Sequence, residues 1–421
     1  MHISSVSAGD AIVPVPQGSA EAAALAWRAL QPERWPLPLE AFPADAALVG
    51  GAVRDALLQR LGPEPDLDLV VSGDAIALCR QLSRRHGGSA VVLDAERSIA
   101  RLVIQGWSVD LARQEGGSLL SDLQRRDYTV NAMALPLAEP TALVDPHGGL
   151  AHLRQGRLVA IAETNLLDDP LRLLRGVRLA NALGFALDPS SATWIKTHRQ
   201  RLQTVAGERV LTELEKLANA PSGELGLLQC LDWGLLNPWQ GSDPGRSLPQ
   251  LNREQAEAIG LNAHDAAIAL PLARLAALLD APGLKALRSS RKLQQRVERL
   301  RRWHSKLSDR QPAEDAEALP ESERLQLHLE LEPDLPALLL SWPREAASAW
   351  LRRWCDASDP LFHPKPAIDG LSLQRHLGLK ASPQLGSLLQ FLMLERAFGR
   401  LNGEGEALQK AAQWLRTDPE D

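Results

Sequence analysis

Cysteine is scarce in this sequence, and long apolar runs are missing. Its 421 residues include three cysteines, Cys79, Cys230 and Cys355, which stand far apart without the spacing of a metal site. We therefore expect buried thiols in a reducing compartment. No apolar run approaches a membrane span, and the first residues do not combine a charged start with an apolar core. We expect a cytoplasmic protein with no membrane partner.

A strong excess of positive charge is also missing. The net charge of −6 argues against a uniformly basic coat for nucleic acid, although it permits a local basic patch. With 45% hydrophobic and 23% charged residues the composition is typical of globular proteins, and 421 residues exceed one ordinary core. We expect two to four domains.

The hydrophobic periodicity changes near residue 163. Before it, short apolar runs bounded by Gly, Asp or Arg predict strands; after it, apolar residues follow a helical period. The sequence predicts an α+β protein: an extension with a first helix over 1–45, a mixed α/β domain over 46–162, and helices over 163–240 and 241–421. Strands are predicted at 46–49, 67–71, 90–93, 100–104, 108–111, 132–135, 142–144 and 158–161, a helix at 193–205 and a loop at 311–320.

The stretch Leu48–Ser72 combines a glycine turn with two acids. Gly50 and Gly51 let the backbone approach a ligand closely and turn its N–H groups toward a phosphate. Asp66 and Asp68 are two apart on a predicted strand, so both carboxylates point to one side. Two hard oxygen ligands beside a phosphate cradle favour Mg²⁺ bound together with a nucleoside triphosphate.

Asp110 supplies a third carboxylate, again on a predicted strand. If that strand lies beside the one that carries Asp66 and Asp68, three carboxylates converge, as two-metal phosphoryl transfer requires. Taken singly, Asp66 also reads as a turn acid after Pro65, and Asp110 as an acid at a strand end.

Two further charged segments follow. Arg125, Arg126 and Asp127 precede a predicted strand; Asp127 could accept from a ribose hydroxyl and the arginines could bind phosphates, or the three could form a surface salt-bridge cluster. Asp169 and Arg172 share a helix face after Pro170, so together they could read the Watson–Crick edge of a base or simply cap and pair on the helix. Arg175, three residues further on, could reach the triphosphate from the same face.

A basic helix is predicted over 288–306. It holds many Arg and Lys against a single Glu, which suits an RNA backbone but also fits a solvated helix face. The candidate RNA-binding residues are Arg291, Lys292, Arg299 and Arg302.

The charged motifs occur in the order and spacing of a known family. GGAVRD at 50–55, DLD at 66–68, RRDYTVNA at 125–132 and DDPLRLLR at 168–175 resemble the motifs of the class II tRNA nucleotidyltransferase and poly(A) polymerase family. The resemblance covers about residues 46–217. It implies a polymerase beta-like nucleotidyltransferase head with a mixed five-stranded sheet, then an all-helical neck, body and tail.

The resemblance also implies roles for individual residues. The neck, 163–240, would recognise the base, and 241–421 would bind tRNA. Asp66 and Asp68, with Asp110, would bind Mg²⁺ for catalysis; Gly50, Gly51 and Arg54 would attend the triphosphate; Arg126 and Asp127 would recognise the ribose; Asp169 and Arg172 would act as a protein template for the base. Asn131 and Arg175 complete the predicted nucleotide-binding set.

One departure from the family concerns the final product. Only 14 residues separate Asp110 from Arg125. Family members that complete the CCA end have a longer interval with a flexible loop associated with the switch from CTP to ATP, whereas CC-adding members have it cut short. We therefore predict an enzyme that adds two CMP residues to tRNA from CTP and works with a separate A-adding enzyme. A full CCA-adding enzyme that also uses ATP, an A-adding enzyme, a poly(A) polymerase and a non-catalytic RNA-binding relative remain alternatives.

Overall fold

The protein divides into two compact units in a computed structural model that describes residues 15–241, 247–307 and 311–417. One unit ends at Val205 and the other begins at Ala206. The first 14 residues of the predicted extension, 1–45, lie outside the described residues. None of the helices in the described ranges is long and apolar enough to cross a membrane.

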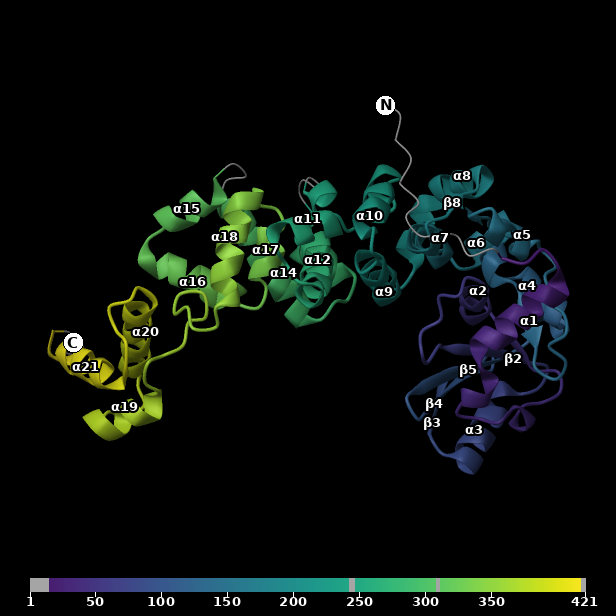
Figure 1. Ribbon diagram of the computed structural model, residues 1–421, viewed down its shortest axis with the longest axis horizontal. Coiled ribbons are helices and arrows are strands. Elements are labelled where there is room, and N and C mark those ends of the chain that lie inside the picture. Colours follow the sequence, from purple (N-terminus) through teal and green to yellow (C-terminus); the bar gives the residue numbers. More distant parts are fainter. Residues whose placement is uncertain (1–14, 242–246, 308–310, 418–421) are drawn as a thin grey trace. The chain divides into compact units, whose positions relative to one another are not determined.

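The first unit is built on a six-stranded mixed sheet with strand order β3-β4-β5-β2-β1-β6 (Figure 1). β2 and β5 are parallel, and the other neighbouring strands are antiparallel. The strands are β1 (Ala47–Val49), β2 (Leu67–Val71), β3 (Ser89–Asp94), β4 (Ile99–Ile104), β5 (Trp107–Arg113) and β6 (Ala134–Pro136). The α+β fold is confirmed, but the expected five strands are one too few, because β6 pairs along the outer edge of β1.

The two faces of the sheet differ in burial. Val109 and Leu111 of β5 are fully buried, as is Leu102 of β4, on the face that α3 (Ala75–His86) covers. Asp68 and Asp110 lie on the other face and remain partly accessible, although Val70 on that face is buried. The period-2 pattern of these strands therefore separates a packed face from a polar one.

Three predicted strands are wrong or shorter than expected. Segment 142–144 contributes a single bridge, between Val144 and Ala134. Of 158–161 only the start is a strand: β7 (Arg157–Leu158) pairs with β8 (Ala186–Leu187) in a separate two-stranded sheet. Of 132–135 only the last two residues belong to β6, because the chain first forms the 3-10 turn η4 (Thr129–Asn131).

Helices surround this sheet and continue beyond it to Val205. They are α1 (Ser19–Leu30), α2 (Gly51–Leu57), α3, α4 (Leu119–Gln124), α5 (Gly149–Arg154), α6 (Glu163–Asp168), α7 (Leu171–Leu183) and α8 (Pro189–His198), with short 3-10 helices η1 (Pro32–Arg34), η2 (Leu39–Ala41), η3 (Glu115–Gly117) and η5 (Arg199–Thr204). The predicted helix over 193–205 thus ends at His198 and continues as η5.

The regular elements described in the second unit are all helices, as predicted, apart from an isolated bridge between Gln240 and Leu279. Its elements are α9 (Gly207–Ala218), α10 (Gly223–Asp232), η6 (Leu248–Gln250), α11 (Arg253–Ile259), α12 (Ala263–Leu278), α13 (Ala281–Ala286), α14 (Arg291–Lys306), α15 (Pro312–Ala318), α16 (Glu321–Leu331), α17 (Leu335–Leu339), α18 (Arg344–Cys355), α19 (Gly370–Leu377), α20 (Pro383–Ala397) and α21 (Glu404–Thr417). The loop expected over 311–320 is wrong, since α15 occupies most of it; Pro312 stands at the first helical position, where proline is tolerated.

Buried charge organises one end of this unit. The Arg274 side chain of α12 is 2% exposed and forms an ion pair with Glu224 of α10. Its guanidinium also donates to the backbone oxygens of Ala218, Ala220 and Leu251, at 2.7–2.8 Å. These bonds satisfy the buried cation and tie three segments together.

Candidate active site

The three predicted carboxylates lie on, or next to, two neighbouring strands, β2 and β5. Asp68 of β2 stands directly opposite Asp110 of β5 in the parallel register, and Asp66 precedes β2 by one residue. The condition under which the three acids would converge, that these two strands lie side by side, is met. Since residues two apart on a strand share a face, all three acids belong to the accessible face of the sheet.

Asp68 is largely buried and has charges of both signs around it. Burial, followed by the charge of Asp110, raises the pKa of Asp68 to about 6; Asp66 adds to the rise, and the guanidinium of Arg126 opposes it. A carboxylate held near two others is a place where a bound cation would be stabilised, so the residues present fit a divalent ion.

Asp110 is held by a partner that was not predicted from the sequence, Arg101. Both of its carboxylate oxygens accept from Arg101 of β4, at 2.7 and 2.8 Å. Within the described ranges, no group of three or more His, Cys, Asp or Glu side chains is arranged as a ready metal site. In this arrangement both oxygens of Asp110 are thus engaged by Arg101.

The Gly50 turn lies against this acidic face. Gly50 has φ +76°, a conformation that L side chains rarely adopt, and it is the N-cap residue of α2. A Cβ atom there would stand 3.1 Å from Oδ2 of Asp68 and 3.6 Å from Nη1 of Arg126. Glycine is therefore required at this point, both for the turn and for the close approach of the two charged groups.

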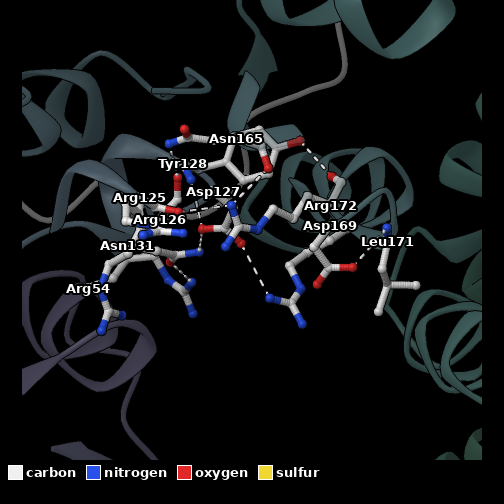
Figure 2. Close-up of polar contacts among 11 residues, drawn as sticks. Arg54, Arg125, Arg126, Asp127, Tyr128, Asn131, Asn165, Asp169, Leu171 and Arg172 are labelled. Atoms are coloured by element: carbon white, nitrogen blue, oxygen red, sulfur yellow. Dashed lines mark hydrogen bonds and ion pairs between the residues drawn. The ribbon is translucent and has the colours of Figure 1, made fainter. Parts of the chain in front are cut away.

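Arg54 of α2 connects the turn to the RRDYTVNA segment. Its Nε and Nη2 donate to the neighbouring Asp55 carboxylate at 2.8 Å, and its Nη1 donates to Oδ1 of Asn131 at 2.5 Å. Asn131 in turn donates to Asp127 at 3.3 Å. Arg54 is only 11% exposed, so the structure holds this cation in one place (Figure 2).

Asp127 is the node at which several elements meet (Figure 2). It is 5% exposed and accepts from the Tyr128 amide at 2.7 Å and from Nη1 of Arg175 at 3.4 Å. Burial by itself would raise the pKa of Asp127, but Arg175, the Tyr128 amide and Arg172 more than offset it, so the pKa lies below its usual value. The carboxylate stays ionised, and it links η4 to α7.

Asp169 and Arg172 stand at the start of α7. The carboxylate of Asp169 accepts from the Leu171 amide at 3.3 Å, as a helix-capping acid does. Nη1 of Arg172 donates to two backbone oxygens, those of Arg125 at 2.9 Å and Asn165 at 2.8 Å. Both side chains are partly accessible to solvent.

Other residues that hold the site were not predicted from the sequence. Asp122 of α4 is buried and accepts from Nε and Nη2 of Arg126 at 3.1 and 3.0 Å, an i,i+4 pair that spacing could have revealed. Tyr128, the only tyrosine of the chain, is fully buried; its hydroxyl donates to the Arg172 backbone oxygen at 2.8 Å. Asn165 of α6 donates from its side chain to the backbone oxygens of Gln124 and Arg126, and no spacing in the sequence indicates these contacts.

The interval between Asp110 and Arg125 is packed against the sheet. After the end of β5 it forms η3 and then α4, whose Leu123 belongs to a core cluster with Val70 of β2 and Ala47 of β1. Leu119 packs against the same cluster. The interval therefore covers part of the face that bears the acids, and it supplies Asp122 to Arg126.

In the second unit, α14 carries the predicted basic surface. Arg291, Lys292 and Arg299 are exposed. Arg302 is about half exposed and forms an ion pair with Glu330 of α16. Two other cations of this helix are similarly engaged: Arg296 with Asp334 at 2.6 Å and Lys306 with Glu323 at 2.5 Å.

Comparison with known proteins agrees with this arrangement. The sequence matches the family described as "Poly A polymerase head domain" over residues 46–159, and "Probable RNA and SrmB- binding site of polymerase A" over 184–240. It is 35% identical to the CC-adding tRNA nucleotidyltransferase of Synechocystis sp., over 90% of this chain and 95% of the relative. It is 30% identical to the A-adding tRNA nucleotidyltransferase of Deinococcus radiodurans, over 91% and 98%.

The fold is shared with solved structures. One is the Thermotoga maritima CCA-adding enzyme complexed with tRNA, with a TM-score of 0.64 at 22% identity over 88% of this chain and 91% of that one. The family prediction made from the motifs is confirmed. Nucleotidyltransferases of this kind use divalent metal ions. The chain belongs to the class II tRNA nucleotidyltransferase family, enzymes that transfer nucleotides to the 3′ end of tRNA.

Proposed function

We propose that this enzyme adds CMP to the 3′ end of tRNA from CTP, stops after the second cytidine, and leaves the terminal adenosine to a separate A-adding enzyme. The observation that carries the proposal is the interval between Asp110 and Arg125. Its 14 residues are used up by the end of β5, by η3 and by α4, and Leu119 and Leu123 pack into the core. A segment bound in this way has little freedom to rearrange between two nucleotides.

The base-reading pair supports selection of cytosine over uracil. A carboxylate only accepts hydrogen bonds, and a guanidinium only donates them. Asp169 would accept from the exocyclic amine of cytosine, and Arg172 would donate to its ring acceptors. Uracil offers an oxygen in place of the amine and an N–H in place of the ring acceptor. An acceptor would then face the Asp169 carboxylate, and a donor would face the Arg172 guanidinium.

The acids and the glycine turn support a triphosphate site. Asp66 and Asp68 would hold Mg²⁺, with Asp110 as a third ligand. When bound, Mg²⁺ would neutralise phosphate charge and activate the attacking 3′-hydroxyl. Gly50 leaves space beside these acids, and Arg126 presents a cation there because Asp122 fixes two of its nitrogens. Asp127 and Asn131 would bind the ribose or hold the groups that do.

The helical remainder would bind the tRNA. Residues 163–240 would form the neck that recognises the base, and 241–421 the body and tail. Exposed Arg291, Lys292 and Arg299 of α14 would contact phosphates, since cations that no carboxylate neutralises release the most counterions on binding. Arg302, paired with Glu330, would contribute less.

The proposal is tested by one incorporation assay with purified enzyme. Transcripts of one tRNA that end before the CCA sequence, after the first C and after CC are each offered CTP, ATP or both. We expect two CMP additions to the first transcript, one to the second and none to the third. Efficient AMP addition to the transcript that ends in CC would overturn the CC-adding assignment in favour of a CCA-adding or A-adding enzyme.

A further inference from the structure

Two side chains from the α6–α7 segment hold three successive backbone oxygens at the end of α4, those of Gln124, Arg125 and Arg126. Nδ2 of Asn165 donates to the Gln124 oxygen at 2.8 Å and to the Arg126 oxygen at 2.7 Å. The oxygen between them, that of Arg125, accepts from Nη1 of Arg172 at 2.9 Å.

Asn165 acts on Arg172 from two sides. Its side chain fixes the segment 124–126, whose Arg125 oxygen binds Arg172. Its own backbone oxygen accepts from Nη1 of Arg172 at 2.8 Å. Both hydrogens of Nη1 are therefore used by the protein. The remaining donors of Arg172, Nε and Nη2, lie on the edge of the guanidinium that is left for a base.

Burial makes this arrangement rigid. Asn165 is 7% exposed, and both of its amide hydrogens are committed to backbone oxygens, so no water can easily replace it. Tyr128 adds a further constraint, because its hydroxyl donates to the backbone oxygen of Arg172 at 2.8 Å. The side chain and the backbone of Arg172 are thus both tied to the segment that ends α4.

We propose that Asn165 is a positioning residue for base selection. By fixing the carbonyl that Arg172 binds, it sets the direction in which Arg172 presents its free edge to the incoming base. This inference rests on the proposed base-reading role of Arg172. Loss of Asn165 would let the guanidinium turn, and the enzyme would then distinguish cytosine from uracil less well, even though Arg172 itself is intact.

The test measures kcat/KM for CTP and for UTP on a tRNA transcript that lacks its CCA end. We expect Asn165→Ala to lower the CTP-to-UTP ratio by about 10- to 100-fold, the usual effect of removing a group that orients a ligand-binding side chain. Asn165→Ser, which keeps one donor, should give an intermediate ratio. It also provides a folded variant if Asn165→Ala proves too unstable.

Ser191→Ala is the matched control. Ser191 is fully buried in the same unit and accepts from the Ala160 amide at 2.9 Å, so its loss also removes a buried bond to the backbone, but without contact to Arg172. The control should lower the melting temperature and leave the CTP-to-UTP ratio within about twofold.

Arg172→Ala separates this inference from the proposal on which it rests. If Arg172→Ala abolishes discrimination and folded Asn165→Ala keeps it, or lowers both kcat/KM values equally, the positioning role is overturned while the base-reading role stands. If Arg172→Ala retains full discrimination, the base-reading role itself fails, and the inference fails with it.

Discussion

The two units of this enzyme use arginine in opposite ways. Around Asp127 in the first unit, Arg54, Arg126 and Arg172 each give one or more nitrogens to fixed protein oxygens. On α14 in the second unit, the cations proposed to meet RNA stand exposed. A nucleotide must be placed to within a fraction of an ångström for reaction, which requires held side chains, whereas a phosphate backbone accepts charge from many positions.

The comparison also distinguishes arginines that stabilise the fold from arginines that could bind a ligand. Arg274 in the second unit is fixed even more completely than Arg172, yet all of its bonds go to the protein and its side chain is 2% exposed. Arg172 commits one nitrogen and keeps an accessible edge. A buried arginine whose donors are all used by the protein therefore indicates a structural role, whereas the uncommitted edge of Arg172 is what its proposed base-reading role requires.

The largest expected effect lies in the first unit. Asp68→Ala should lower CMP incorporation by about 10³-fold or more, because it removes an acid that would hold the catalytic metal ions. Affinity for tRNA should stay within about twofold, since the RNA surface is proposed to lie on other elements. Single-turnover incorporation and filter binding measure the two quantities. Glu139→Gln, at an exposed position in the same unit, is the control. A loss of tRNA binding with incorporation preserved would contradict the division of labour.

The second unit should show its own largest effect in stability. Arg274→Met leaves Glu224 as an unpaired buried carboxylate and frees the oxygens of Ala218, Ala220 and Leu251, so we expect a loss of about 3–5 kcal/mol in the free energy of unfolding. Denaturant unfolding measures it.

Arg253→Met is the control for Arg274→Met. Arg253 is exposed and paired only with Glu257 on its own helix, so it should cost less than about 0.5 kcal/mol. Equal losses for the two variants would show that the buried cation is not a structural centre.

Sequence patterns predicted the parts of the site that depend on local order. The spacing of two placed Asp66 and Asp68 on one side, and the structure sets Asp68 directly opposite Asp110 of the neighbouring strand. The partner of Asp110 was within reach as well: the tight turn after Ile104 pairs that residue with Trp107, and counting back along the hairpin brings Arg101 opposite Asp110. In a hairpin, the position of the turn fixes which residues of the two strands lie opposite each other.

The errors arise where distant segments decide the conformation. The strand predicted at 132–135 starts late, because Thr129 and Val130 just before it, which favour strands by residue type, are buried and open a 3-10 turn instead. Asn165 has no motif at all, because the oxygens that it binds lie 39 and 41 residues earlier in the chain. Such contacts depend on how α6 packs against distant segments, and the periodicity of apolar residues in α6 itself does not indicate this.

The same substitution should have opposite signs in the two units. A Cβ atom on Gly176 of α7 would lie 1.9 Å from the hydroxyl oxygen of Tyr128, so Gly176→Ala should destabilise the protein by about 2–3 kcal/mol. Gly386 of α20 has open space around it, so Gly386→Ala should stabilise by about 0.5–1 kcal/mol through helix propensity. Thermal unfolding measures both. If both variants were stabilising, Gly176 would not be required by Tyr128.

A smaller effect is expected from the exposed cations of α14. Replacing Arg291, Lys292 and Arg299 together with Ala should weaken tRNA binding and lower the slope of log affinity against log salt concentration by about 1 for each phosphate that the variant no longer binds. Incorporation at saturating tRNA should change little. A salt slope equal to that of the unaltered enzyme would mean that α14 does not bind RNA.

The smallest effect is expected for a cation of the same helix that already has a partner. Arg302 is paired with Glu330 and lies over the ring of Trp303, so RNA would have to compete with these interactions. Arg302→Ala should therefore reduce the salt slope by clearly less than Arg299→Ala, although the two positions are about one turn apart. Glu330→Gln tests the reason: with the competing carboxylate removed, Arg302 should gain influence, and tRNA should bind more tightly at low salt than to the unaltered enzyme. An equal loss for Arg302→Ala and Arg299→Ala would show that exposure, and not freedom from a partner, decides which cations of the second unit meet RNA.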